Sequence, residues 1–221
     1  MKKTFCSFLI AVVFSLTGLC AHAGEATAQA IVLRVKGSCV ANIGGQSSTL
    51  KVGDKLPQGA TIITSPSSEV DVQTFNGAVA TIGANTTVNL EKLSVTTDNG
   101  KVTKQTSLLN LKVGSVISTI DPANHNINDY GIRTPKGVAA ARGTIYTVTV
   151  TASGKVQVYV TNSVVVFINP TTGQTVTVQA GYVVTVDENG AIGKPQLSTN
   201  PVPSDAPPVT KLDSIDTSPH R

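Results

Sequence analysis

The stretch that decides the fold runs Glu69-Val70-Asp71-Val72-Gln73-Thr74-Phe75-Asn76-Gly77-Ala78-Val79-Ala80-Thr81-Ile82. Its first half alternates polar and apolar residues, which places Val70 and Val72 on one face of an extended strand. Asn76 and Gly77 then supply the strongest short hairpin signal, because both residues tolerate a positive φ. A second apolar run follows at residues 79–82. The stretch therefore predicts two antiparallel strands joined by a tight turn.

Short apolar runs of the same kind recur in the C-terminal third of the chain. They are residues 145–150, 156–160, 164–168 and 175–178. Turn-forming segments such as Ser153-Gly154 stand between them, so residues 143–186 predict an unbroken antiparallel meander. No window after residue 23 has the i, i+3, i+4, i+7 apolar spacing of an amphipathic helix. The predicted fold class is all-β, and the pattern leaves open whether the antiparallel strands form a sandwich or a β-solenoid-like stack.

The N-terminus is typical of a secretory signal peptide. Lys2 and Lys3 give it a positive start, and residues 5–19 are almost wholly apolar. Ala21-His22-Ala23 then offers small residues at the two positions that a signal peptidase recognises. We expect residues 1–23 to be removed by cleavage after Ala23, which predicts a periplasmic or secreted protein.

The cysteines and the remaining hydropathy pattern set further limits on the structure of the exported part. An alternative hypothesis makes Cys20 a lipidated residue, although Leu19 stands where a small residue is preferred. No second apolar run of spanning length follows, so we expect no transmembrane segment in the mature chain. Cys39 is the one thiol left after cleavage, so no intramolecular disulfide can form and the domain must be held by its own core.

The charge and ring content of the chain weigh against a nucleic-acid partner. The precursor has 17 Lys and Arg against 13 Asp and Glu, and removal of Lys2 and Lys3 leaves a formal charge of +2. The basic residues are scattered singly, Trp is absent, and aromatic residues make up only 4% of the chain. Such a chain lacks both the basic patch and the stacking rings that nucleic-acid binding uses.

The chain divides into one domain and a tail. Residues 24–194 predict a single domain, because about 170 residues are enough for one hydrophobic core. Residues 195–221 hold six prolines among Ser, Thr and Asp, a composition typical of a disordered tail. The alternative for this tail is a segment that docks on a partner or contacts the cell wall.

Three segments carry a resemblance to a known family. They are residues 52–64 (VGDKLPQGATIIT), residues 68–86 (SEVDVQTFNGAVATIGANT) and residues 132–148 (IRTPKGVAAARGTIYTV). In this order they resemble the FecR domain of bacterial envelope proteins. In that family a G-D-x-L-x-x-G-x-x-I-x-T start leads into alternating strands joined by a (D/N)-G turn, and a T-P-x-G-x-x-x-x-R-G-T-x-(F/Y)-x-V segment enters a final meander. The resemblance covers about residues 44–186.

The resemblance implies structural or interface roles for the residues that match these motifs. They are Gly53, Asp54, Asn76, Gly77, Thr134, Pro135, Arg142, Gly143 and Thr144. The family's namesakes are signal relays, in which a periplasmic FecR domain responds to a loaded outer-membrane transporter and a cytoplasmic arm controls a sigma factor. In this chain we expect a cleavable signal peptide in place of that arm and its membrane helix. The resemblance therefore implies a binding or sensory module of the envelope whose partner is another envelope protein, such as an outer-membrane transporter or regulator.

Arg142 is the motif residue with the most specific expected contact. It stands among small residues, so we expect its guanidinium to lie packed there. In that position it could cross-link backbone carbonyls or pair with a carboxylate such as Asp54 or Asp71.

The mature chain has few of the side-chain combinations that enzymes use for catalysis. His125 lies in the polar segment 121–129, which predicts a solvated loop with no rigid partner for catalysis. Cys39 sits in a strand-like segment, where a buried small residue is expected. Asp121, Asn124 and their neighbours could gather oxygen ligands for calcium, but the spacing matches no known loop and no Glu closes it. We expect no catalytic residues, no metal and no cofactor.

These observations favour a non-enzymatic protein-binding or signal-relay module of the bacterial cell envelope. Its candidate recognition surfaces are exposed strand edges and the loops at residues 98–100 and 121–129. The alternative is a structural or scaffolding envelope protein that is tethered through its Pro-rich tail.

Overall fold

The computed structural model describes residues 24–198, and most of them lie in strands. The predicted signal peptide and most of the predicted tail lie outside these residues. One short 3-10 turn, η1 (Pro122–Asn124), interrupts the strands, and none of the described residues forms a helix long and apolar enough to cross a membrane. The all-β prediction is confirmed.

The strands form one continuous mixed sheet that folds over at β10 (Lys101–Ile120) into two layers. Layer A contains β1 (Gly24–Thr27), β3 (Cys39–Ile43), β4 (Gln46–Thr49), β6 (Thr61–Thr64), β9 (Thr87–Asp98), β11 (Asn128–Thr134), β12 (Gly137–Ala141), β15 (Val164–Ile168) and β16 (Thr175–Gln179). Layer B contains β2 (Gln29–Lys36), β5 (Lys55–Pro57), β7 (Glu69–Phe75), β8 (Ala78–Ile82), β13 (Ile145–Val150), β14 (Val156–Val160), β17 (Tyr182–Val186) and β18 (Gln196–Leu197).

The long strand β10 belongs to both layers. Its first part pairs with β9 and, in parallel, with β11, both in layer A. From Gly114 onward it pairs with β8 and β13 in layer B. Gly114 has a φ of +102°, and a Cβ atom placed on it would lie 2.5 Å from the Cα atom of Thr86. Only glycine fits where the strand passes from one layer to the other.

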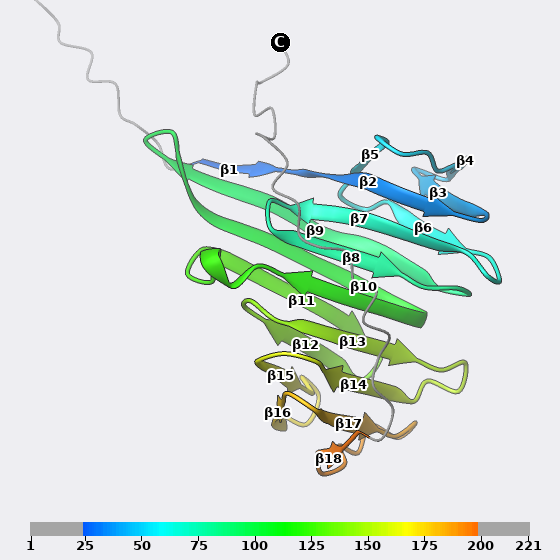
Figure 1. Cartoon of the computed structure of the whole chain (residues 1–221), viewed down its shortest axis with the longest axis vertical. Helices are drawn as coiled ribbons and strands as arrows, with labels where there is room; N and C mark the ends of the chain where they lie inside the picture. The colour runs from blue at the N-terminus through cyan, green and yellow to red at the C-terminus, as the bar shows by residue number, and fades with distance from the viewer. Residues whose placement is uncertain (1–23, 199–221) are drawn as a thin grey trace, which may run out of the picture.

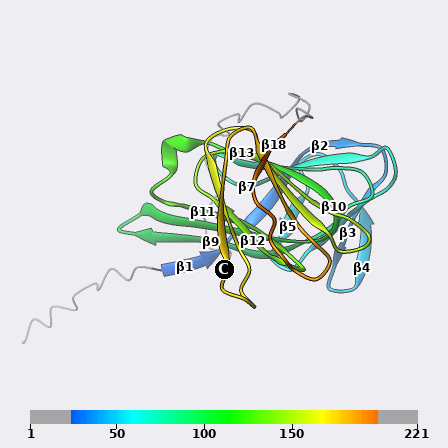
Figure 2. The ribbon, with the colours of Figure 1, turned by 90° about the horizontal axis from the view of Figure 1, so that it is seen from below.

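Successive hairpins are added to the two layers in turn (Figures 1 and 2). Hairpin β11–β12 lies in layer A, β13–β14 in layer B, β15–β16 in layer A and β17–β18 in layer B. Each hairpin pairs with the previous hairpin of its own layer, since β12 pairs with β15 and β14 pairs with β17. The prediction of a simple meander over residues 143–186 was therefore wrong. The arrangement is a sandwich that grows along its long axis.

The hairpin predicted at Asn76-Gly77 is confirmed, and β7 and β8 pair directly across it. Gln196 and Leu197, which the sequence analysis placed in the tail, form β18 against β17. Inward side chains of both layers share one buried core.

An aromatic trio joins the layers inside this core. The ring of Tyr130 in β11 makes edge-to-face contacts with Phe75 of β7 and Tyr146 of β13, at centroid distances of 6.1 and 6.4 Å. The Ser118 hydroxyl donates to Tyr130 Oη over 3.1 Å, and burial raises the pKa of Tyr130. Each edge-to-face pair contributes about 0.5–1.5 kcal/mol beyond its buried area.

Replacing Gly114 by alanine should destabilise the domain more than the same change at Gly53. Both residues have φ near +90° to +100°, but a Cβ atom at Gly53 meets nothing within 4 Å. Gly53→Ala should cost about 1–3 kcal/mol of backbone strain, and Gly114→Ala should add roughly another 1–3 kcal/mol from the clash with Thr86. Thermal unfolding followed by circular dichroism measures both. Equal losses of stability would show that the passage at Gly114 is not closely packed.

Candidate functional site

Four chain segments meet at one end of layer B. They are Asn76–Gly77, residues 121–127, residues 142–144 and Asn162–Ser163, and together they are called the motif end here. The Asp121 amide donates to the Gly77 carbonyl over 2.8 Å, and the Ile120 amide donates to the Thr144 carbonyl over 3.0 Å. Five of the nine motif residues from the sequence are thus brought together.

Two glycines of the motif end allow a close approach to the loop. A Cβ atom on Gly77 would lie 3.2 Å from the Cβ atom of Asp121. Gly143 has a φ of +110°, and a Cβ atom there would lie 2.6 Å from the Cα atom of Pro122. The glycines of the N-G and R-G-T motifs are therefore required by backbone packing against one loop.

The loop itself is ordered by local hydrogen bonds. Asp121 Oδ1 accepts from the Ala123 amide over 2.8 Å and caps η1, while the His125 amide donates to the Pro122 carbonyl over 3.2 Å. At the other end, the Ile127 carbonyl accepts from the Gln105 amide over 2.7 Å. The sequence predicted a solvated loop over 121–129 with no rigid partner. It is shorter than that and anchored at both ends, because residues 128 and 129 belong to β11.

A cleft of about 540 Å³ opens between these segments. It is lined by Thr119, Ile120, Asp121, Pro122, Gly143, Thr144, Ile145, Asn162 and Ser163. Ile120 and Ile145 give it an apolar floor, and the Thr144 hydroxyl donates to the Asn162 carbonyl at the rim. A shallow site of this kind suits an apolar side chain of a partner together with a few polar contacts.

Arg142 does not make the contact expected from the sequence. Its side chain is exposed, and within residues 24–198 it has no hydrogen bond or ion pair. Asp54 accepts from the Lys51 amide over 2.8 Å instead, and Asp71 pairs with Arg34. The expectation of a packed cross-link was therefore wrong, while an interface role for Arg142 remains a prediction.

The remaining motif residues lie elsewhere. Gly53 and Asp54 form the turn before β5. Thr134 and Pro135 form the turn between β11 and β12, where Thr134 Oγ1 accepts from the Gly137 amide over 3.1 Å. Both pairs of residues help to form turns of the scaffold, as the preference of glycine and proline for turns predicts.

An ion-pair cluster on the outer face of layer B was missed by the sequence analysis. Arg34 donates to both carboxylate oxygens of Asp71, over 2.6 and 3.2 Å, and also to Glu69. Thr81 Oγ1 donates to Asp71 Oδ1 over 2.8 Å. These hydrogen bonds, first to Asp71 and then to Glu69, raise the pKa of Arg34. Strand alternation is the sequence signal that could have indicated this ion-pair cluster, since Glu69 and Asp71 share one face of β7.

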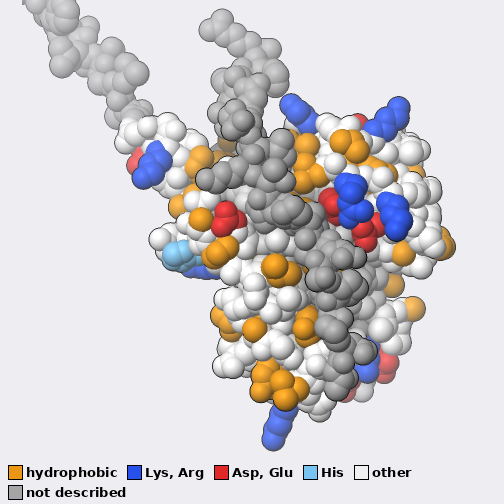
Figure 3. Space-filling view, in the orientation of Figure 1, with side chains coloured by type: hydrophobic (Ala, Val, Ile, Leu, Met, Phe, Trp, Pro, Cys, Tyr) orange, Lys and Arg blue, Asp and Glu red, His pale blue; other side chains and the backbone are white. Residues whose placement is uncertain are grey.

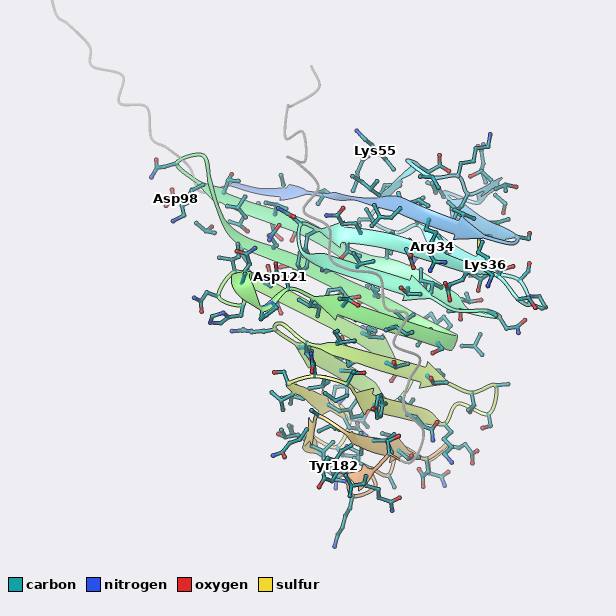
Figure 4. All side chains as sticks on the ribbon, in the orientation of Figure 1. Arg34, Lys36, Lys55, Asp98, Asp121 and Tyr182 are labelled. Atoms are coloured by element: carbon teal, nitrogen blue, oxygen red, sulfur yellow. The ribbon has the colours of Figure 1, made fainter. Side chains whose placement is uncertain are left out.

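The two ends of layer B differ in character. Figure 3 shows basic and acidic side chains close together where β2 and β7 lie, in agreement with the Arg34 ion pairs. Figure 4 places Asp121 at the opposite end of the strands from Arg34 and Lys36, and at the same end as Asp98. The two loops proposed from the sequence for recognition thus lie at one end of the molecule.

The side chains considered for chemistry lie apart. Cys39 is fully buried, and burial raises the pKa of its thiol, which suits the small core residue that the sequence predicted. His125 is exposed, and its Nδ1 lies 3.0 Å from the Pro122 carbonyl oxygen. Within residues 24–198 no three His, Cys, Asp or Glu side chains come together in a group that could hold a metal ion.

The fold and this end define an all-β module of two layers, in which turns that carry the sequence motifs lie beside a small cleft. Residues 60–166 match the FecR protein family, which confirms the resemblance found in the sequence. The matched range includes the motif end and begins after Gly53 and Asp54.

Two solved structures are similar to this chain. Both are crystal structures of a candidate anti-sigma factor from Parabacteroides distasonis ATCC 8503, at 2.50 and 1.65 Å resolution. Each has a TM-score of 0.49 and 15% sequence identity, and the match covers 62% of this chain and 59% of that chain. This chain therefore spans about three fifths of the length of that protein. Comparison with curated proteins gave no match.

Arg142→Ala should leave stability unchanged, whereas Gly143→Ala should lower it. An exposed side chain without partners among the described residues contributes less than about 0.5 kcal/mol. A Cβ atom on Gly143 would clash with Pro122 and add strain, at a combined cost of roughly 2–5 kcal/mol. Melting temperatures of the two neighbouring variants test this. A clear loss for Arg142→Ala would restore the cross-link interpretation.

Proposed function

We propose that this chain is exported to the bacterial cell envelope and acts there as a non-enzymatic protein-binding module of a signal relay. The observation that carries the proposal is the packing of two FecR motif segments against one loop beside the cleft. Gly77 and Gly143 are far apart in the sequence, yet both pack against the loop at residues 121–127, and the Thr144 carbonyl accepts from the Ile120 amide just before it.

The motif end has the properties of a recognition surface. Its loops are held by hydrogen bonds on a rigid two-layer scaffold, and such loops commonly carry binding residues. Arg142 is an exposed cation that directly precedes Gly143 of the cleft lining, and arginine is enriched among residues that dominate binding energy. An apolar side chain in the cleft with a carboxylate near Arg142 would match this surface.

The envelope location rests on the N-terminal sequence. The charged start, the apolar run and the small residues before Gly24 support cleavage after Ala23. In that compartment the partner would be another envelope protein, such as an outer-membrane transporter or regulator.

The mature protein should begin at Gly24. Intact-mass measurement of the protein recovered from the envelope fraction tests this, with a Cys20→Ser variant as the control. The unmodified mass of residues 24–221 for both proteins supports the proposal. A lipid-modified mass that is lost on Cys20→Ser would instead establish a lipid anchor, and a full-length mass would contradict export by this route.

Charge reversal at Arg142 should abolish capture of the partner. Residues 24–221 serve as bait in a crosslinking pull-down from envelope extract of the source organism, with captured proteins identified by mass spectrometry. Lys112→Glu is the matched control, because Lys112 is also exposed but lies on β10 outside the motif end. We expect the control to capture the partner as the wild type does and Arg142→Glu to capture at least ten times less.

Two outcomes of this pull-down would contradict the proposal. Equal capture of one partner by all three baits would place the binding surface away from the motif end. Capture of wall or surface components alone, without a specific protein, would favour a scaffolding protein over a relay.

A further inference from the structure

Strand β16 forms an outer edge of layer A. Among the described strands it pairs only with β15. Two hydrogen bonds close the β15–β16 hairpin at its ends. The Asn169 amide donates to the Gln174 carbonyl over 2.9 Å, and the Ala180 amide donates to the Ser163 carbonyl over 2.9 Å. These two bonds determine which backbone groups of β16 point toward β15.

The other side of β16 carries backbone groups that are available to a ligand. Hydrogen-bonded pairs alternate along an antiparallel ladder, so Val176 and Val178 bond to β15 between the two closing bonds. Thr175, Thr177 and Gln179 direct their amide and carbonyl groups away from β15, where no group of residues 24–198 pairs with them. Such a row of backbone groups is a template for one more strand.

The sequence of β16 lacks the features that protect other outer strands. Charged residues and proline commonly block an exposed sheet edge. The outer strand β1 contains Glu25, and the outer strand β5 contains Lys55 and Pro57. In contrast, β16 reads TVTVQ, and residues 156–186 contain no Asp, Glu, Lys, Arg or His. The outer strand β4 is uncharged too, but its sequence QSST has no apolar side chain to pack beside an added strand.

Two apolar side chains of layer B lie close to this edge. Tyr182 of β17 packs against the core, and Leu197 of β18 is its direct partner, so both side chains lie on the inner side of layer B. Leu197 is nevertheless 70% exposed, so the described strands of layer A do not cover it. Strand β18 lies at the foot of the molecule in Figure 1, below β16, and Figure 4 places Tyr182 in the same region.

We propose that the free edge of β16 binds an extended segment of a partner protein as an added strand of layer A. Backbone hydrogen bonds to Thr175, Thr177 and Gln179 hold this segment, and its inward side chains cover Tyr182 and Leu197. Alternate residues of the segment are therefore apolar. Its centre is uncharged, because the strands around the edge offer no opposite charge.

A second copy of the chain is a poorer occupant of this edge. If β16 paired antiparallel with β16 of another copy, a two-fold axis would place layer B of both copies on the same side of the joined sheet. The β17 and β18 strands of each copy would then meet beside the shared edge, where β18 already extends past β16. A single extended segment brings no second layer and meets no such obstacle.

Hydrogen exchange measured by nuclear magnetic resonance on residues 24–221 tests the proposal. The probe is a short peptide that alternates threonine and valine, with a lysine at each end for solubility. The control peptide has proline at its centre, which removes a backbone donor. In the free protein, the amides of Thr175, Thr177 and Gln179 should exchange at least ten times faster than those of Val176 and Val178. The probe should slow exchange of these three amides, and the control peptide should not.

Four variants locate the binding of the probe. Leu197→Gln should weaken it at least fivefold, whereas Ile168→Gln should not, because Ile168 is 40% exposed on the outer face of layer A. Thr177→Pro should abolish binding by removing one outward amide, a change that an outer strand tolerates. Arg142→Glu should bind the probe as the wild type does, since the site is separate from the motif end and independent of the proposed relay function. Melting curves confirm that each variant is folded.

Three outcomes would overturn the proposal. Slow exchange of the Thr177 amide in the free protein would show that the edge is already paired, and slow exchange that is lost on dilution would identify a second copy as the occupant. Failure of the probe to protect the outward amides would show that the edge does not accept a strand. Equal weakening by Leu197→Gln and Ile168→Gln would place the peptide elsewhere.

Discussion

The passage of β10 between the two layers is the constraint on which the rest of the fold depends. Layer A and layer B are connected through this strand, since β9 and β11 pair with its first part and β8 and β13 with its last. Gly114 permits the change of direction against Thr86. The same strand leads directly into Asp121, so it also fixes the loop around which the motif end is built.

Individual strands and turns were predictable because they depend on residues that are neighbours in the sequence. Asn76-Gly77 specifies its hairpin because Gly77 takes a φ of +90°, and alternation in Val70–Val72 specifies which side chains face the core. The layer that a hairpin joins is not specified in this way. A period of two says which face is apolar, but β13–β14 and β15–β16 have the same pattern and lie in different layers.

The candidate site was likewise predictable only in part. The sequence supplied the residues of the motif end through a family resemblance, and the structure explains Gly77 and Gly143 by their packing against Asp121 and Pro122. It could not place Arg142, because a run of small neighbours fits an exposed turn as well as a packed one. Nor did it pair Arg34 with Asp71, whose contact depends on β2 lying beside β7 across 37 positions of sequence.

The alternation of hairpins has a consequence for how such a protein can change in length over evolution. Each hairpin pairs with the one before it in its own layer, as β12 does with β15 and β14 with β17. A duplication that adds one hairpin to each layer would therefore extend the sandwich without altering pairings already made. Stacked repeat proteins change size in this way. The end that carries β16 and β18 could thus diverge among relatives while the segments around β10 stay constant.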